Sequence, residues 1–143
     1  MTTRVVPILD GVIWEPNAPE EKFAVEGDRF AALVLLPHPD DVDTRSVVIF
    51  WSGVESATFG PPNDEGRYYH SLYRFGLADL SWAGEVINDE SENSTFRHFI
   101  VPTKEGLADV HARQIAWARL EGLTDANAAI HRLKPRSGDP QLT

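Results

Sequence analysis

The strand that decides the fold is Ser46-Val47-Val48-Ile49-Phe50-Trp51, a run of β-branched and aromatic residues. Such side chains suit the pleated, half-buried surface of a sheet, so this run predicts a central strand. Gly53 interrupts the pattern before a further stretch at 54–59, either as a β-bulge or as a hairpin turn. The sequence leaves these two alternatives open.

Upstream of this strand, Phe30-Ala31-Ala32-Leu33-Val34-Leu35-Leu36 is a continuous apolar run of strand length. A run of this kind predicts a strand that is buried on both faces. Residues 22–26 alternate only weakly between apolar and polar. Residues 5–14 are apolar but broken by Pro7, which predicts a short hairpin or an edge strand.

Downstream, 80–87 and 96–101 predict two more strands, and Pro102 ends the second where a missing N–H is tolerated. The stretch 107–120 is ambiguous. Its apolar residues at helical spacing and its alanines favour a helix, whereas the alternation of 108–113 favours a strand. Thr124 can cap a short helix from Asp125 to about Leu133, and Pro135 would end it.

Several short strands separated by turn signals indicate the α+β class, mainly antiparallel β, as a compact β-rich sheet or barrel-like domain with a short C-terminal helix. The 143 residues, 42% apolar and 24% charged, fit one globular domain, predicted to span residues 1–135. Residues 136–143 are predicted to be a disordered tail.

The chain carries 22 acidic residues against 13 lysines and arginines, a formal charge of −9, and has no cysteine. An acidic protein lacks the attraction that draws basic surfaces to nucleic acids and anionic membranes, so neither is an expected partner. Disulfides and thiolate chemistry are excluded. The N-terminus lacks the apolar core of a signal peptide, and we expect a cytoplasmic location.

The stretch 60–76 combines two prolines, an asparagine, acids, arginines, a histidine and all three tyrosines of the chain between apolar runs. Loops carry function more often than cores do, because polar groups can be presented there without being buried unpaired. One interpretation is a capped loop with a turn at Asn63-Asp64 and a helical turn closed by Gly76. The other is a ligand or catalytic site.

On the second interpretation, the catalytic residues are Asp64, Glu65 and His70. A carboxylate near aromatic rings is desolvated, which raises its pKa toward the range useful for acid–base chemistry, and a histidine titrates near neutrality. The predicted ligand-binding residues are Trp51, Asn63, Arg67, Tyr68, Tyr69, Tyr73, Trp82 and Glu85. A solvent-facing position is the alternative for Glu85.

Histidines 70, 98 and 111 together with Asp64 would ligate a metal if the sheet brought them together. Their spacing in the sequence matches no standard metal site, so no metal and no cofactor are predicted. Two of these histidines lie on strands of the proposed 96–112 hairpin, which makes their proximity testable.

A larger pattern is formed by Val47-Val48-Ile49-Phe50-Trp51-Ser52-Gly53, Pro62-Asn63-Asp64-Glu65, His70-Ser71-Leu72-Tyr73, Gly76-Leu77 and Trp82-Ala83-Gly84-Glu85-Val86. The series resembles a family of small, uncharacterised bacterial proteins over residues 30–112. That resemblance implies a site at the Pro-Asn-Asp-Glu loop and His70, but no activity. It also implies a strand at 107–112, in a hairpin that turns near 104–106.

The sequence therefore predicts a β-rich protein that binds a small molecule in a pocket closed by residues 60–76. It can be a cofactor-independent acid–base enzyme of the isomerase, cyclase or hydrolase type. The alternative is a non-catalytic interaction or regulatory protein that meets a basic partner through its acidic surface. A homodimer stays open in either case.

Overall fold

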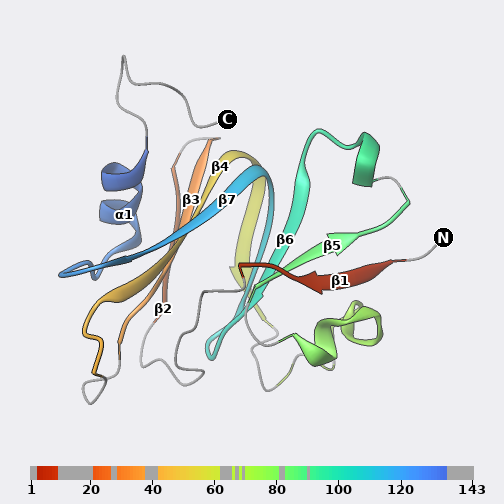
Figure 1. The fold of residues 1–143 in the computed structure, drawn as a ribbon, viewed down its shortest axis with the longest axis horizontal. Helices are drawn as coiled ribbons and strands as arrows, with labels where there is room; N and C mark the ends of the chain where they lie inside the picture. The colour runs from red at the N-terminus through yellow and green to blue at the C-terminus, as the bar shows by residue number, and fades with distance from the viewer. Residues whose placement is uncertain are drawn as a thin grey trace.

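The computed structural model describes residues 3–9, 21–26, 29–37, 42–61, 66, 68, 70–80, 83–89 and 91–134. They form one seven-stranded antiparallel sheet in the order β1-β5-β6-β7-β4-β3-β2 and one short helix (Figure 1). The elements are β1 (Arg4–Pro7), β2 (Glu21–Glu26), β3 (Phe30–Leu35), β4 (Ser46–Gly60), β5 (Gly84–Ile87), β6 (Arg97–Pro102), β7 (Leu107–Leu120) and α1 (Ala126–Leu133). The predicted class, mainly antiparallel β with a short C-terminal helix, is confirmed.

The sheet curls over on itself without closing. The side chain of Glu21 on β2 accepts a 3.1 Å hydrogen bond from the backbone N–H of Glu105 in the β6–β7 turn. In a flat sheet, β2 and β7 would be three strand spacings, about 14 Å, apart. The rings of Phe23 on β2 and Phe59 on β4 likewise stack with centroids 5.5 Å apart. Because β1 and β2 remain its edges, the sheet is open.

The main hydrophobic core fills the concave side of this curl and includes residues of β3, β4, β6 and β7. Successive residues of a strand point to opposite faces, so the alternate residues face outward. Two smaller clusters cover the outer face. Helix α1 packs on outward-facing residues of β3 and β4 through Ala126, Ala129 and Ile130. Residues 72–80 pack on β1, β5, β6 and β7.

The pairing of β4 with β7 decides between the alternatives left open for Gly53 and for residues 107–120. Residues 46–60 are a single strand, and Gly53 lies within it at φ +62° beside a register shift between Val54 and Ser56. The hairpin alternative is therefore wrong, and the irregularity lies between Val54 and Ser56, just after Gly53. Residues 107–120 form one strand paired with β4 along its length, so the helix alternative is wrong. The β6–β7 hairpin expected from the resemblance is also present.

Helix α1 begins one residue later than expected and has a different cap. The carboxylate of Asp125 accepts hydrogen bonds from the backbone N–H groups of Asn127 and Ala128, which makes Asp125 the N-cap in place of Thr124. The expected turn before Gly76 is a 3-10 turn at Tyr73–Phe75, with Gly76 at φ +121°. The predicted tail at 136–143 lies outside the described residues.

Candidate functional site

Three ionisable side chains meet on the outer face of the β6–β7 hairpin: His98 on β6, and Asp109 and His111 on β7. Their neighbours Phe99 and Val110 belong to the concave core, so alternation turns all three outward. The register places His98 directly opposite His111. We call these three residues the histidine cluster.

The cluster is held by short polar contacts. Nε2 of His98 lies 2.7 Å from Oδ1 of Asp109, and the rings of His98 and His111 stack with centroids 4.1 Å apart. Ser56 on β4 adds a fourth group, since its hydroxyl shares a 3.2 Å hydrogen bond with Nδ1 of His111. All these side chains are partly accessible, with 24% of His98 and 31% of Asp109 exposed, so a ligand can reach them.

Burial and charge act together on the acid–base properties of this cluster. Burial alone would raise the pKa of Asp109, but the hydrogen bond from His98 and the positive charges of His98, His111 and His70 outweigh it, so the pKa is lowered. Burial lowers the pKa of His111, and the neighbouring charge of His98 lowers it further. An ionised carboxylate thus lies beside two imidazoles, of which His98 contacts Asp109 and His111 contacts Ser56.

The segment 70–80 lies on the same outer face. Leu72, Leu77 and Leu80 pack in one cluster with Ile100 and Leu107, which alternate with core residues just as the histidine cluster does. Gly76 allows this close packing, because a Cβ atom there would lie 2.5 Å from the carbonyl oxygen of Val5.

His70 begins this segment. Its Nδ1 atom accepts a 3.0 Å hydrogen bond from the backbone N–H of Leu72, and the ring is near enough to Asp109 to affect the pKa of that carboxyl group. The structure therefore brings His70 into electrostatic range of the histidine cluster.

Several predicted site residues cannot be placed. The candidate catalytic residues Asp64 and Glu65 lie outside the described residues, as do four candidate ligand-binding residues: Asn63, Arg67, Tyr69 and Trp82. Tyr68 is described and 57% exposed, and Tyr73 is half-buried in the 3-10 turn. Their roles in a site stay predictions.

Trp51 and Glu85 have clear structural surroundings. Trp51 is fully buried on the concave side, opposite to the histidine cluster, and its indole N–H has no hydrogen-bond partner among the described residues. Glu85 on β5 forms a two-pronged ion pair with Arg97 on β6, at 2.7 and 3.0 Å. This ion pair explains how an acid is accommodated in the middle of the strand.

Asp109 and Ser56 are site residues that the sequence did not indicate. The sequence predicts His98 and His111 as a potential pair, whereas Asp109 is only a polar position in the alternation of 108–113. The feature of the sequence that could have revealed Asp109 is the predicted hairpin. Once its turn is placed near 104–106, the register sets His98 opposite His111 and near Asp109.

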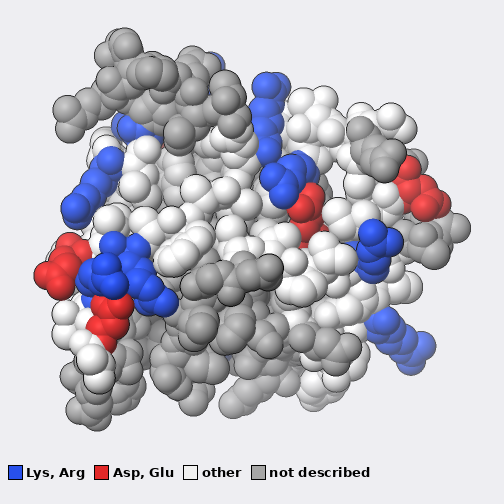
Figure 2. Space-filling view, viewed as in Figure 1, with Lys and Arg blue, Asp and Glu red and all other residues white. Residues whose placement is uncertain are grey.

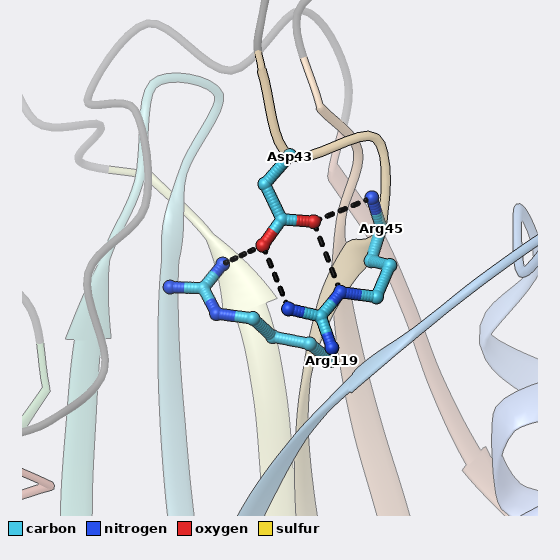
Figure 3. A network of polar contacts seen from close by, with 3 residues as sticks. All are labelled: Asp43, Arg45 and Arg119. Carbon is cyan, nitrogen blue, oxygen red and sulfur yellow. Dashed lines mark hydrogen bonds and ion pairs between the residues drawn. The ribbon is translucent and has the colours of Figure 1, made fainter.

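A second polar network lies at the start of β4 and the end of β7 (Figure 3). The carboxylate of Asp43 accepts hydrogen bonds from the backbone N–H, Nε and Nη2 of Arg45, and Arg119 approaches to 4.0 Å. The hydrogen bonds from Arg45 lower the pKa of Asp43 to about 2. The one carboxylate is paired with two guanidinium groups that hold it in place, which indicates a structural role for this network.

On the face shown in Figure 2, lysine and arginine side chains are scattered, and only some of them stand beside an acidic side chain. The described part of that face shows no continuous acidic patch of the kind that the alternative of a basic partner would use. Within the described residues, no helix is sufficiently long and apolar to cross a membrane.

Comparisons with protein-family models, with curated proteins and with solved structures find no match to this chain.

Proposed function

We propose that this protein binds a small organic molecule at the histidine cluster and transfers a proton to or from it, with His98 as the acid–base group. The observation that carries the proposal is the 2.7 Å contact between Nε2 of His98 and Oδ1 of Asp109. A carboxylate that accepts from one imidazole nitrogen fixes the orientation of the ring and determines which nitrogen carries the proton. The other nitrogen is then the group that exchanges a proton with a ligand.

The surrounding residues supply the remaining parts of such a site. Ser56 offers a hydroxyl for a polar group of the ligand, and His111 lies beside His98 as a second imidazole. The segment 60–76 is predicted to close the site. Its last part belongs to the stretch 70–80, whose leucines pack on the same face. Asp64 and Glu65 remain candidates for a second acid or base contributed by this segment.

The proposal is tested first by ligand binding. A fragment library is screened against the tag-free ¹⁵N-labelled protein, and binding is followed through the backbone amide signals. We expect hits that shift the signals of Ser56, His98 and His111. The variant His98→Gln should keep the fold and lose these hits. The matched control is His131→Gln, because His131 is on α1, 67% exposed and outside the cluster.

Proton transfer is tested on the hits themselves. Each hit that carries a weakly acidic carbon-bound proton is incubated with the protein in D₂O, and loss of its proton signal is followed by NMR. We expect exchange with the wild type and with His131→Gln, and a loss of at least about tenfold with His98→Gln. Equal exchange rates for wild type and His98→Gln, or hits that map only to other surfaces, would refute the proposal.

A further inference from the structure

We infer that His98, Asp109 and His111 form a binding site for a divalent transition-metal ion, with Zn²⁺ as its most suitable probe. One ligand atom from each residue can be chosen so that all three lie within 4.8 Å of one another. Two imidazoles and one carboxylate are a ligand set found in catalytic zinc sites and in non-haem iron sites. Three protein ligands leave a coordination position for water or substrate.

The distances require only side-chain adjustment. A tetrahedral ion bound at about 2.0–2.1 Å from each ligand holds the ligand atoms about 3.3 Å apart. Nε2 of His98 and Oδ1 of Asp109 are 2.7 Å apart and need to separate slightly. Pairs at the 4.8 Å limit need to close by roughly 1.5 Å, and these side chains are only partly buried.

The hydrogen bonds around His98 and His111 also favour metal binding. A metal ion would replace the proton that His98 and Asp109 now share. Ser56 is placed to accept a hydrogen bond from Nδ1–H of His111, which leaves Nε2 of that ring free to bind the ion. Orientation of a ligating imidazole by such a partner is usual in protein metal sites.

The charge of the site also suits a cation. Asp109 supplies a carboxylate, and the two histidines bind a metal as neutral imidazoles, so the site offers one negative charge and two neutral donors to a divalent ion. The nitrogen ligands disfavour Ca²⁺ and Mg²⁺, which prefer oxygen. The inference goes beyond the proposed proton transfer: in a metal-bound site His98 is a ligand, and a metal-bound water becomes the acid–base group.

The test is a titration of tag-free, chelator-treated protein with Zn²⁺ by calorimetry, with Mg²⁺ as the control ion. We expect one Zn²⁺ per chain and no binding of Mg²⁺ at the same concentration. His98→Gln, Asp109→Ala and His111→Gln should each weaken Zn²⁺ binding by at least about tenfold, and Ser56→Ala by up to about tenfold. The control His131→Gln should bind as the wild type does.

Imidazole ¹⁵N signals of the wild type give an independent measurement that needs no variant to fold. Zn²⁺ should shift the signals of His98 and His111 and leave that of His131 in place. The inference is overturned if the wild type binds no Zn²⁺, if the three ligand variants bind as tightly as the wild type, or if the ion shifts other histidines instead.

The chelator separates this inference from the proposed function. Proton exchange that persists in EDTA, together with absence of Zn²⁺ binding, would leave the proposed function standing and refute the metal site. Zn²⁺ binding without any proton exchange on the small molecule would support the metal site and refute the proposed function. Exchange that requires Zn²⁺ would support the metal site and transfer the acid–base role to the metal-bound water.

Discussion

His98 and Asp109 are joined across the β6–β7 hairpin on the diagonal, with Nε2 2.7 Å from Oδ1, although neither residue is the other's direct partner in the sheet. The direct partners are His111 for His98 and Ile100 for Asp109. Diagonal neighbours in a sheet lie within reach of long side chains. The contact therefore depends on the register of the hairpin, since a slip of one residue would turn one of the two side chains to the concave core.

A double-mutant cycle should detect this contact as a coupling between the two residues. We expect His98→Ala and Asp109→Ala to couple by roughly 0.5–1.5 kcal/mol in the free energy of unfolding, because a partly buried, charge-assisted hydrogen bond is lost in either variant. The measurement is urea unfolding of the four proteins in EDTA near neutral pH.

A second cycle provides the control. In the described part of the chain the Ser56 hydroxyl bonds His111 and not His98, so the coupling between His98 and Ser56 should be smaller. If the effects of His98→Ala and Asp109→Ala are simply additive, the 2.7 Å contact does not stabilise the folded state.

Gly53→Ala should destabilise the protein more than Gly122→Ala does. Both glycines have a left-handed backbone, at φ +62° and φ +68°. A Cβ atom at Gly53 would lie 2.9 Å from Cβ of Arg113, whereas no atom of the described residues lies within 4 Å of one at Gly122. The backbone strain of about 1–2 kcal/mol is common to both variants, so the difference isolates the close approach of β4 and β7.

Urea unfolding of the two variants measures this difference, which we expect to be at least about 1 kcal/mol. Equal losses would mean that Arg113 moves aside at no cost. A larger loss in Gly122→Ala would contradict the account of the bulge.

The sequence predicted the strands whose local preference agrees with their place in the sheet. The runs at 46–51 and 30–35 consist of residues that favour strands, and both are strands with little exposure. The stretch 107–120 was ambiguous because its alanines favour helix. Its pairing with β4 over almost the whole length overrides that local preference, and a single sequence does not reveal such a non-local pairing.

The candidate site was harder to predict for the same reason. The sequence predicts the site at 60–76, where polar and aromatic residues are close together. The histidine cluster instead joins residues 11 apart, His98 and Asp109, and residues 55 apart, Ser56 and His111. Only the hairpin register and the β4–β7 pairing bring them together. Of the predicted catalytic residues, His70 is the one that the structure describes, and it lies in electrostatic range of Asp109.

Asp125→Ala should destabilise the protein by about 1 kcal/mol, the typical cost of losing an N-cap. The Asp125 carboxylate accepts from the N–H groups of Asn127 and Ala128, and α1 covers outward-facing residues of β3 and β4. Thr124→Ala, one residue away, should stay within about 0.5 kcal/mol of the wild type. The stabilities of the two variants are compared by thermal unfolding, monitored by circular dichroism. A larger effect of Thr124→Ala would mean that Thr124 is the N-cap, as the sequence indicates.

The carboxyl group of Asp43 should titrate with a midpoint of about 2, below its ordinary value of 3.8, because Arg45 donates three hydrogen bonds to it. The folded-state pKa lies below the unfolded one, so the unfolded chain binds more protons between the two values. The stability that Asp43 contributes is therefore complete above the unfolded pKa and is lost as the pH falls toward the folded one. The difference in Tm between wild type and Asp43→Asn should shrink between about pH 5 and about pH 2.

The titration is measured by NMR of the Asp43 carboxyl carbon, and two arginine variants tell which partner is responsible. Arg45→Gln should move the midpoint most of the way back toward 3.8, since Arg45 supplies the hydrogen bonds. Arg119→Gln should move it little, because Arg119 is 4.0 Å away and acts only through its charge across partly exposed surface. A wild-type midpoint near 3.8, or a larger effect of Arg119 than of Arg45, would show that the network of Figure 3 does not persist in solution.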